Sequence, residues 1–372
     1  MTCRYALIGS GMMGQEHIRF LNHLEGATVS AVADPDPAMR EQAATLAGAK
    51  AFSDYRALLS SNLADALIIA SPNHTHHDVL IDAMATDLPI MVEKPLCSTV
   101  DDAKAIVRHA ENRRAPVWVA MEYRYMPAIA RLIDEVKGDR IGRLRMLSIR
   151  EHRFPFLPKV GNWNRFAHMS GGTLVEKCCH FFDLMRLIIG AEPTKIYASG
   201  GQDVNHVDER YEGKRPDIID NAYVVVDFDN GVRAMLDLCM FAEASRDQEE
   251  IAAIGDRGKV ECGIPSSTLT IGERRPVERM GIALPLEREI VPVDEELLEM
   301  GHHNGATFYQ HERFREVILG RCEPEVTVED GLQAVIMGAT AERSIELGRP
   351  LSLHLSNADG LADDGERWDM AS

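Results

Sequence analysis

The first 120 residues contain short, continuous hydrophobic runs that alternate with amphipathic stretches. Strands covered on both faces read as continuous hydrophobic segments, so these runs predict buried parallel strands. The strands are predicted at 5–8, 28–33, 64–70, 89–92 and 116–121. Helices are predicted between them at 15–24, 37–47, 54–60, 75–85 and, capped by Ser98 or Thr99, up to about 113. This alternation predicts a doubly wound α/β sheet whose ligand lies across the carboxyl ends of the strands.

A different pattern begins after Tyr123. Strands are predicted at 144–150, 195–199, 222–228, 232–240, 250–254, 259–263 and 268–271. Two hairpins join four of them, and the first turns at Asp229-Asn230-Gly231, a strong short turn signal. Helices are predicted at 304–319 and 328–346, the second ended by Gly348 and Pro350. This half predicts an α+β domain with an open, mostly antiparallel sheet that helices cover on one face.

A glycine-rich turn joins the first predicted strand to the first helix. It reads Gly9-Ser10-Gly11-Met12-Met13-Gly14, which is G-x-G-x-x-G in its required strand-to-helix context. Gly9 permits the tight turn, Gly11 lets the backbone approach a pyrophosphate, and Gly14 lets the helix pack closely on the strand. The helix N-terminus adds free N–H groups and the positive end of a dipole. The turn therefore predicts a Rossmann-type dinucleotide site.

The second predicted strand ends at Asp34, 20 residues after Gly14 (34 − 14). A carboxylate at this place binds the ribose hydroxyls of an adenosine and repels a 2′-phosphate, which favours NAD over NADP. The alternative is a purely structural βαβ unit with an incidental surface aspartate. Asn73 and Lys94 also lie at carboxyl ends of predicted strands.

Lys94 belongs to Glu93-Lys94-Pro95, which follows the fourth strand. Beside a nicotinamide ring, this lysine could hydrogen-bond a substrate hydroxyl and ease its deprotonation, with its pKa lowered by partial burial. An exposed turn with an ion pair explains the position about equally well.

The segment 171–183 holds a second group of ionisable residues. On one helix, Glu176, His180 and Asp183 stand at i, i+4 and i+7 and share a face. Their flanking residues are apolar nearly all round, which predicts a buried helix whose polar groups need partners or a ligand. A histidine oriented by a carboxylate can exchange a proton with an alcohol. The alternative is a core histidine with its hydrogen bonds satisfied.

Together these motifs resemble the glucose-fructose oxidoreductase, inositol dehydrogenase and rhizopine-catabolism (Gfo/Idh/MocA) family over nearly the whole chain. The motifs are the glycine turn, Ser71-Pro72-Asn73 with His76, Glu93-Lys94-Pro95 and the Gly-Gly segment that leads to His180. The resemblance implies a cis Lys-Pro bond, and contact of Lys94 and His180 with the reacting hydroxyl. The family acid four residues before that histidine is usually Asp, whereas this chain has Glu176, and Lys177 adds a cation without an assigned role.

The candidate site residues follow from the motifs and the resemblance. The predicted catalytic residues are Lys94, His180 and Glu176. The predicted cofactor contacts are Gly9, Gly11, Met12, Met13, Gly14, Asp34, Ser71, Pro72, Asn73, His76, Glu93 and Lys94. The predicted substrate contacts are Lys94, Tyr123, Arg124, Trp163, Arg165, Glu176, Lys177, His180 and Asp183. Ordinary loop packing explains the aromatic and polar residues at 163–168 about as well as sugar binding does.

Composition narrows the classes of partner. The formal net charge of −18 opposes binding to nucleic acid or an anionic membrane surface. The chain enters a core strand at once, without a signal peptide, and no apolar run is long enough to cross a bilayer. Seven cysteines without a C-x-x-C pair fit a cytoplasmic protein with reduced thiols. His302-His303 and Cys178-Cys179 lack the spacing of a metal site, so no metal is expected.

The sequence thus predicts an NAD-dependent dehydrogenase acting on a sugar, an inositol-like polyol or a related compound. Two alternatives remain: a glycoside hydrolase that retains NAD, and a non-catalytic nucleotide-binding sensor. We expect an NAD-binding domain at 1–122, a substrate-binding and oligomerisation domain at 123–355, and a disordered acidic tail at 356–372. An apolar sheet face exposed to water promotes aggregation. We therefore expect the chain to form a homo-oligomer, a dimer or tetramer, through the second sheet.

Overall fold

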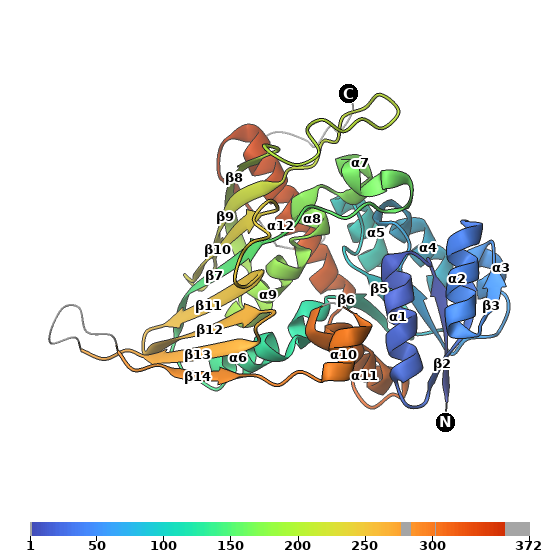
Figure 1. Cartoon of the computed structure of the whole chain (residues 1–372), viewed down its shortest axis with the longest axis horizontal. Helices are drawn as coiled ribbons and strands as arrows, with labels where there is room; N and C mark the ends of the chain where they lie inside the picture. The colour runs from blue at the N-terminus through green and yellow to red at the C-terminus, as the bar shows by residue number, and fades with distance from the viewer. Residues whose placement is uncertain (1, 277–283, 302, 354–372) are drawn as a thin grey trace.

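The computed structural model describes residues 2–276, 284–301 and 303–353. Two sheets lie side by side in it, each with its own helices (Figure 1). The tail expected at 356–372 lies outside the described residues. No helix within the described ranges is long and apolar enough to span a bilayer.

The first sheet is parallel, in the order β3-β2-β1-β4-β5-β6. Its strands are β1 (Cys3–Ile8), β2 (Ala27–Ala33), β3 (Lys50–Phe52), β4 (Ala66–Ile69), β5 (Ile90–Glu93) and β6 (Val117–Ala120). The helices between them are α1 (Met12–His23), α2 (Pro37–Ala47), α3 (Tyr55–Leu59), η1 (Asn73–Thr75), α4 (His76–Met84) and α5 (Val100–Ala110). The doubly wound parallel sheet is thus confirmed, and its strand ends bring the glycine turn, Asp34, Asn73 and Lys94 to one edge.

The second sheet has nine strands, in the order β14-β13-β12-β11-β7-β10-β9-β8-β15. They are β7 (Leu144–His152), β8 (Pro193–Gly201), β9 (Asn221–Phe228), β10 (Arg233–Cys239), β11 (Glu249–Gly255), β12 (Gly258–Ile264), β13 (Thr268–Glu273), β14 (Glu287–Ile290) and β15 (Leu351–Ser352). Among the described strands of this sheet, the central β7–β10 pair is the only parallel one. The predicted mostly antiparallel sheet, with both hairpins, is confirmed.

Helices cover one face of this sheet and fill the space toward the first one (Figure 1). They are η2 (Glu122–Tyr125), α6 (Pro127–Lys137), η3 (Val160–Arg165), α7 (Ala167–Ser170), α8 (Thr173–Glu176), α9 (Cys179–Ile189), α10 (Glu295–Met300), η4 (His303–Gly305), α11 (Ala306–Ile318) and α12 (Val328–Leu347). The long helix α12 packs on β8 and α9 of the second half and on α5 and β6 of the first.

The C-terminal helices complete the core of the first sheet. Phe314 of α11 and Val328, Ala334 and Val335 of α12 belong to the hydrophobic cluster that contains β1, β4 and β5. The backbone N–H of Val119 in β6 also donates to the carbonyl of Val326 at 3.2 Å. The boundary at residue 122 therefore separates the two sheets but not the two cores.

The sequence pattern did not predict several elements, among them the short helices η2, η3 and α7 and five others. Strands β3 and β15 have three and two residues, too few for a period, and all four residues of β14 are exposed. Helix α10 has one buried residue, Leu297. Helix α6 did carry a usable pattern, because its apolar positions 128, 129, 132 and 133 are all buried.

Candidate active site

The glycine turn fits a dinucleotide phosphate. Gly9 has φ +95°, and a Cβ there would lie 2.5 Å from the backbone carbon of Ala70; one on Gly14 would lie 2.2 Å from the carbonyl oxygen of Gly9. These two glycines serve the protein's own packing. A Cβ on Gly11 would meet nothing within 4 Å, so this backbone faces open space at the N-terminus of α1. The turn therefore leaves room where a pyrophosphate would approach.

Asp34 is tied to the glycine turn. One carboxylate oxygen accepts the N–H of Ser10 at 2.6 Å, and the other accepts the N–H of Asp36 at 2.8 Å. These bonds fix the carboxylate at the end of β2, and each oxygen keeps a lone pair for a ribose hydroxyl. Two fixed carboxylate oxygens that can each accept a hydrogen bond fit the hydroxyl groups of the adenosine ribose of NAD.

His76 joins two of the predicted cofactor loops. Its ring nitrogens lie 2.9 Å from the carbonyl oxygens of Pro95 and Ser71. The ring is fully buried, and burial lowers its pKa, so the neutral ring donates to one carbonyl at a time. This geometry differs from the expected cofactor contact: His76 holds the loops, because both of its nitrogens face protein carbonyls. Asn73 likewise donates to the carbonyl of Ser170 at 3.0 Å.

Glu93 and Lys94 are held in place by buried partners. Glu93 lies 2.9 Å from Nε2 of His17 and accepts the backbone N–H of Lys94 at 3.1 Å. The Lys94-Pro95 bond is cis, as the resemblance implied. Lys94 Nζ donates to the backbone carbonyl of Glu176 at 3.1 Å, which carries the amine from the first sheet to the second half of the chain.

The expected lowering of the Lys94 pKa is wrong. Burial does lower it, but Cys179, Glu122, Glu93 and Glu176 together raise it above its usual value. Lys94 is therefore a charged hydrogen-bond donor at neutral pH, and it can polarise a hydroxyl without losing a proton.

The single helix expected to carry Glu176, His180 and Asp183 within 171–183 is also wrong. The chain forms α8 (Thr173–Glu176) and α9 (Cys179–Ile189), with a break at Lys177 and Cys178. The amides of Phe181 and Phe182 both bond to the carbonyl of Cys178. The break leaves the carbonyl of Glu176 as the acceptor for Lys94, so Glu176, His180 and Asp183 do not line one continuous helix face.

His180 is buried (1% exposed) and held by an aromatic stack. The ring of Tyr123 lies parallel to it at 4.0 Å between centroids and 6° between planes. Tyr123 accepts a hydrogen bond from Lys177 and donates one to Glu249 at 3.2 Å. Burial, Lys94 and Lys177 lower the pKa of His180 well below its usual value, which keeps the ring neutral and able to accept a proton.

Two residues near His180 were missed from the sequence. Glu122 Oε1 lies 3.5 Å from Nε2 of His180 and 3.5 Å from Nδ1 of His303. Glu122 follows β6 directly, at the same sheet edge as Lys94, and that position could have identified it. His303 was considered only as part of a metal pair, and its partner His302 lies outside the described residues.

Lys177 belongs to a buried layer behind Tyr123. Its Nζ lies 2.9 Å from Glu151, which stands directly opposite Glu249 on neighbouring strands. Burial lowers the pKa of Lys177, whereas burial and the Glu151 charge raise that of Glu249 to about 6. This layer supports the stacked rings.

The side chain of Glu176 forms an ion pair with Lys159. Its Oε1 lies 3.0 Å from Lys159 Nζ, which also lies 4.4 Å from the ring centroid of Trp163. Trp163 packs edge-on against His74 of the first half. Arg165 is 2% exposed and binds the carbonyl of Phe156 and the carboxylate of Glu209, so it fixes the loop.

Lys94, Glu122, Glu176 and His180 form what we call the open cluster. Among the buried atoms of the described ranges, both oxygens of Glu122, Oε2 of Glu176 and Nδ1 of His180 have no hydrogen-bond partner. Buried polar atoms are normally paired, so these atoms indicate a place for a ligand or water.

Arg124 and Asp183 belong to a second group. Arg124 donates two hydrogen bonds to Asp183 and a third, at 2.7 Å, to the carbonyl of Glu325. Arg186 binds Glu192 and Asp330. We call Arg124, Asp183, Arg186, Glu192 and Asp330 the paired cluster. The structure pairs Arg124 and Asp183 with each other, although both were predicted as substrate contacts.

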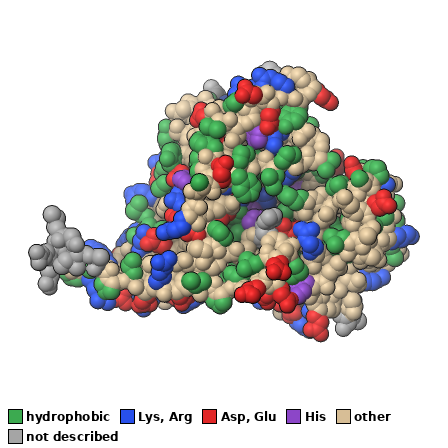
Figure 2. Space-filling model, in the orientation of Figure 1, with side chains coloured by type: hydrophobic (Ala, Val, Ile, Leu, Met, Phe, Trp, Pro, Cys, Tyr) green, Lys and Arg blue, Asp and Glu red, His purple; other side chains and the backbone are tan. Residues whose placement is uncertain are grey.

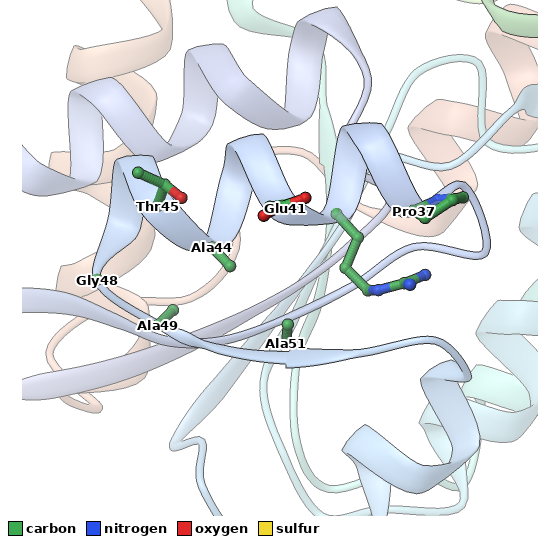
Figure 3. Close-up of a pocket in the computed structure, with 8 residues that line it drawn as sticks. Pro37, Glu41, Ala44, Thr45, Gly48, Ala49 and Ala51 are labelled. Atoms are coloured by element: carbon green, nitrogen blue, oxygen red, sulfur yellow. The ribbon is translucent and has the colours of Figure 1, made fainter.

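Two surface hollows lie apart from the open cluster. One, of about 570 Å³, runs between α2 and the edge strand β3, lined along its length by residues from Pro37 to Ala51 (Figure 3). The other, of similar volume, is lined by residues of the paired cluster. Figure 2 shows a further hollow between the two halves of the molecule, with hydrophobic side chains and histidine at its wall. In the ranges the structure describes, no group of three or more His, Cys, Asp or Glu is arranged to hold a metal.

Comparison with known proteins agrees with this architecture. The family model GFO_IDH_MocA, "Oxidoreductase family, NAD-binding Rossmann fold", matches residues 3–121, and GFO_IDH_MocA_C, "Oxidoreductase family, C-terminal alpha/beta domain", matches residues 133–353. A levoglucosan dehydrogenase solved with NADH and levoglucosan shares the fold, with a TM-score of 0.83 and 19% identity over 95% of this chain and 99% of that one.

Two curated proteins are also similar. The myo-inositol 2-dehydrogenase of Thermotoga maritima is 26% identical over 353 residues, which cover 94% of this chain and 98% of that protein. The rhizopine catabolism protein MocA of Rhizobium meliloti is 31% identical over 193 residues, 52% of this chain and 59% of that protein. From the two family matches, which together span most of its length, this chain belongs to the Gfo/Idh/MocA family of NAD-binding oxidoreductases.

Proposed function

We propose that this protein is an NAD-dependent dehydrogenase that oxidises a secondary alcohol of a sugar or inositol-like polyol. The observation that carries the proposal is the open cluster: a charged Lys94, a neutral buried His180 and unpaired carboxylate oxygens gather at the carboxyl edge of the Rossmann sheet. The sugar-like substrate class comes from the similar proteins, which include an inositol dehydrogenase and a levoglucosan dehydrogenase.

Three residues of this chain would have separate roles in the reaction. Lys94 donates a hydrogen bond to the reacting hydroxyl and holds it. His180 accepts the hydroxyl proton at Nδ1, the ring nitrogen without a partner among the described residues. Glu176 presents its free Oε2 to a neighbouring hydroxyl, while Lys159 restrains its other oxygen. Bound NAD would supply the hydride acceptor.

The glycine turn and Asp34 would hold this cofactor. Gly11 leaves room for the pyrophosphate, and the fixed carboxylate of Asp34 accepts ribose hydroxyls. The same carboxylate repels a 2′-phosphate, so we propose NAD rather than NADP. Binding of the two nucleotides to the purified protein, measured by calorimetry, checks this preference.

The test of the reaction is absorbance of reduced nicotinamide while the protein, supplied with NAD, is screened against sugars, inositols, sugar acids and glycosides. We expect a steady rise with one class of compound, abolished in Lys94→Ala and His180→Ala. Release of free sugar from a glycoside without net NAD reduction would replace the proposal with a glycoside hydrolase that retains NAD. Silence in both assays would favour a sensor.

We also propose that the protein associates with copies of itself through the open face of the second sheet. Large hydrophobic side chains are exposed on four neighbouring strands of that sheet: Met146, Tyr197, Tyr223, Val225 and Met235. Tyr197, Val225 and Met235 stand directly opposite one another across β8, β9 and β10. Such a row is typical of an interface rather than of a face in contact with water.

Light scattering tests this association. We expect a mass of two or four chains, reduced by Tyr223→Lys and unchanged by Leu46→Lys, which alters an exposed residue of α2. A wild-type protein with the mass of one chain would contradict the proposal.

A further inference from the structure

Glu122 is a buried carboxyl group that the roles above do not use. It is 1% exposed and begins η2 directly after β6. Its Oε1 lies 3.5 Å from Nε2 of His180, on the side of the ring opposite to Nδ1. Neither of its oxygens has a hydrogen-bond partner within the described part of the chain. An ionised carboxylate in such a place is costly, so its protonation depends on the groups around it.

Charged and titratable side chains face Glu122 from four elements. They are Glu16 in α1, Glu93 and Lys94 at the end of β5, Cys179 and His180 in α9, and His303 in η4. Burial and Glu93 raise the pKa of Glu122 to about 8, although Lys94 opposes this. The carboxyl group therefore changes its charge near neutral pH, within reach of His180.

The protonated and the ionised states of Glu122 favour different tautomers of His180. A protonated carboxyl can donate its hydrogen to Nε2, which leaves the single ring proton on Nδ1. An ionised carboxylate can only accept, so it favours the tautomer with the proton on Nε2 and a lone pair on Nδ1. The present 3.5 Å separation is slightly longer than a hydrogen bond, and such contacts often tighten when a ligand binds.

We propose that Glu122 is a positioning residue that selects the tautomer of His180: its ionised carboxylate frees Nδ1 to accept a proton, and its protonated carboxyl blocks that atom. On ionisation the carboxyl proton passes to Nε2 while the proton on Nδ1 leaves to solvent, so the pair loses one proton and the ring stays neutral in both states. The consequence for catalysis rests on the proposed function. Alcohol oxidation is then expected to rise with pH to a plateau, with a midpoint near pH 8.

The tautomer itself can be observed without cofactor or substrate. In full-length protein labelled with ¹⁵N-histidine, the ring nitrogen shifts distinguish a protonated from an unprotonated nitrogen. The His180 signals are assigned by their loss in His180→Asn and followed from pH 6 to 10. We expect the proton to move from Nδ1 to Nε2 with a midpoint near pH 8.

Glu122→Gln separates the proposal from a general pH effect. The amide cannot ionise, so we expect no transition: Nδ1 keeps a lone pair throughout if the amide oxygen accepts from Nε2, and a proton throughout if the amide nitrogen donates to it. Glu342→Gln is the matched control, because burial raises the pKa of this carboxyl to about 7, and its Oε1 instead accepts the N–H of Leu174. We expect it to leave the transition in place. Glu122→Asp, which keeps a shortened carboxyl, should displace the midpoint.

A transition that persists unchanged in Glu122→Gln would overturn the inference. Its absence from the assigned His180 signals of the wild-type protein would do so too. The outcome is also distinct from that of the proposed function. If the substrate screen failed, the proposed function would fall, but the titration of the His180 tautomer would still test the role of Glu122. If the protein were an active dehydrogenase and the tautomer did not change with pH, only the inference about Glu122 would be overturned.

Discussion

The open cluster and the paired cluster are both built from buried charged side chains, yet they differ in how completely those side chains are paired. In the paired cluster, all three guanidinium nitrogens of Arg124 donate hydrogen bonds, two to Asp183 and one to the carbonyl of Glu325. In the open cluster, Glu122, Glu176 and His180 keep atoms without partners in the described ranges. Buried charged groups that pair with each other stabilise the fold, whereas buried polar atoms without a partner indicate a binding site for a ligand. Burial and charge alone do not distinguish a binding site from a structural one.

The largest effect expected from this difference is on activity. Lys94→Met removes the donor to the reacting hydroxyl, so the rate of NAD reduction should fall roughly 10²–10⁴-fold. The side chain of Lys94 donates a charged hydrogen bond to the carbonyl of Glu176, so the free energy of unfolding should fall by only about 1.5–3 kcal/mol. Steady-state kinetics measures the change in the rate of NAD reduction, and urea unfolding measures the change in the free energy of unfolding. A variant with full activity would contradict the role of Lys94.

The paired cluster should respond in the opposite way. Arg124→Met leaves Asp183 buried (1% exposed) without its partner, which should reduce the free energy of unfolding by about 3–5 kcal/mol. Denaturant unfolding measures this loss. The double variant Arg124→Met/Asp183→Leu removes both charges and should regain most of it. A small loss in the single variant would show that the pair contributes little.

The third expectation compares one chemical change in both clusters. The folded pKa of Glu122, about 8, exceeds its unfolded value, so the folded state holds the extra proton between these values and loses stability as pH rises through them. Glu122→Gln removes this slope of up to about 1.4 kcal/mol per pH unit and should be the more stable protein at pH 8. Asp183→Asn should be less stable than the wild type at the same pH. Unfolding measured at several pH values gives the stability of each variant relative to the wild type. If both variants were more stable, or both less stable, than the wild type at pH 8, the two clusters would not differ in this respect.

The smallest effect is expected at the edge of the open cluster. Lys159 restrains Glu176 through a half-buried ion pair. Lys159→Met should raise KM about 2–5-fold, about 0.4–1 kcal/mol, with little change in kcat, because Glu176 loses the cation on Oε1 but keeps Oε2 for the substrate. Lys195→Met, which breaks the remote pair with Asp227, is the matched control and should leave KM unchanged. A large fall in kcat instead would give Lys159 a direct part in the reaction.

The sequence predicted the fold well because its signals are local. Continuous hydrophobic runs mark β1, β4 and β5, and Asp229-Asn230-Gly231 joins β9 to β10 as expected. The glycine turn and Asp34 meet at one sheet edge because parallel strands bring their carboxyl ends together. These features depend on residues close together along the chain.

The site was harder to predict because its pairings are long-range. No local pattern shows that Arg124 meets Asp183, 59 residues away, or that Lys94 bonds to Glu176, 82 residues away. The helix period placed Glu176 and His180 on one face, but the chain breaks at Lys177 and Cys178, where no glycine or proline marks the end of a helix. The pKa of Lys94 depends on carboxylates from three segments, so position in the sequence gave its wrong direction.

The return of the C-terminal helices to the first core has a consequence for how the chain folds during synthesis. The core around β6 lacks Val326, Val328 and Val335 until about 200 further residues have left the ribosome. At roughly 5–20 residues per second, the nucleotide-binding half waits about 10–40 s with part of its hydrophobic surface uncovered. An isolated fragment 1–122 would keep that surface exposed permanently. The part of the chain that is translated first thus completes its core only after α11 and much of α12 have been made.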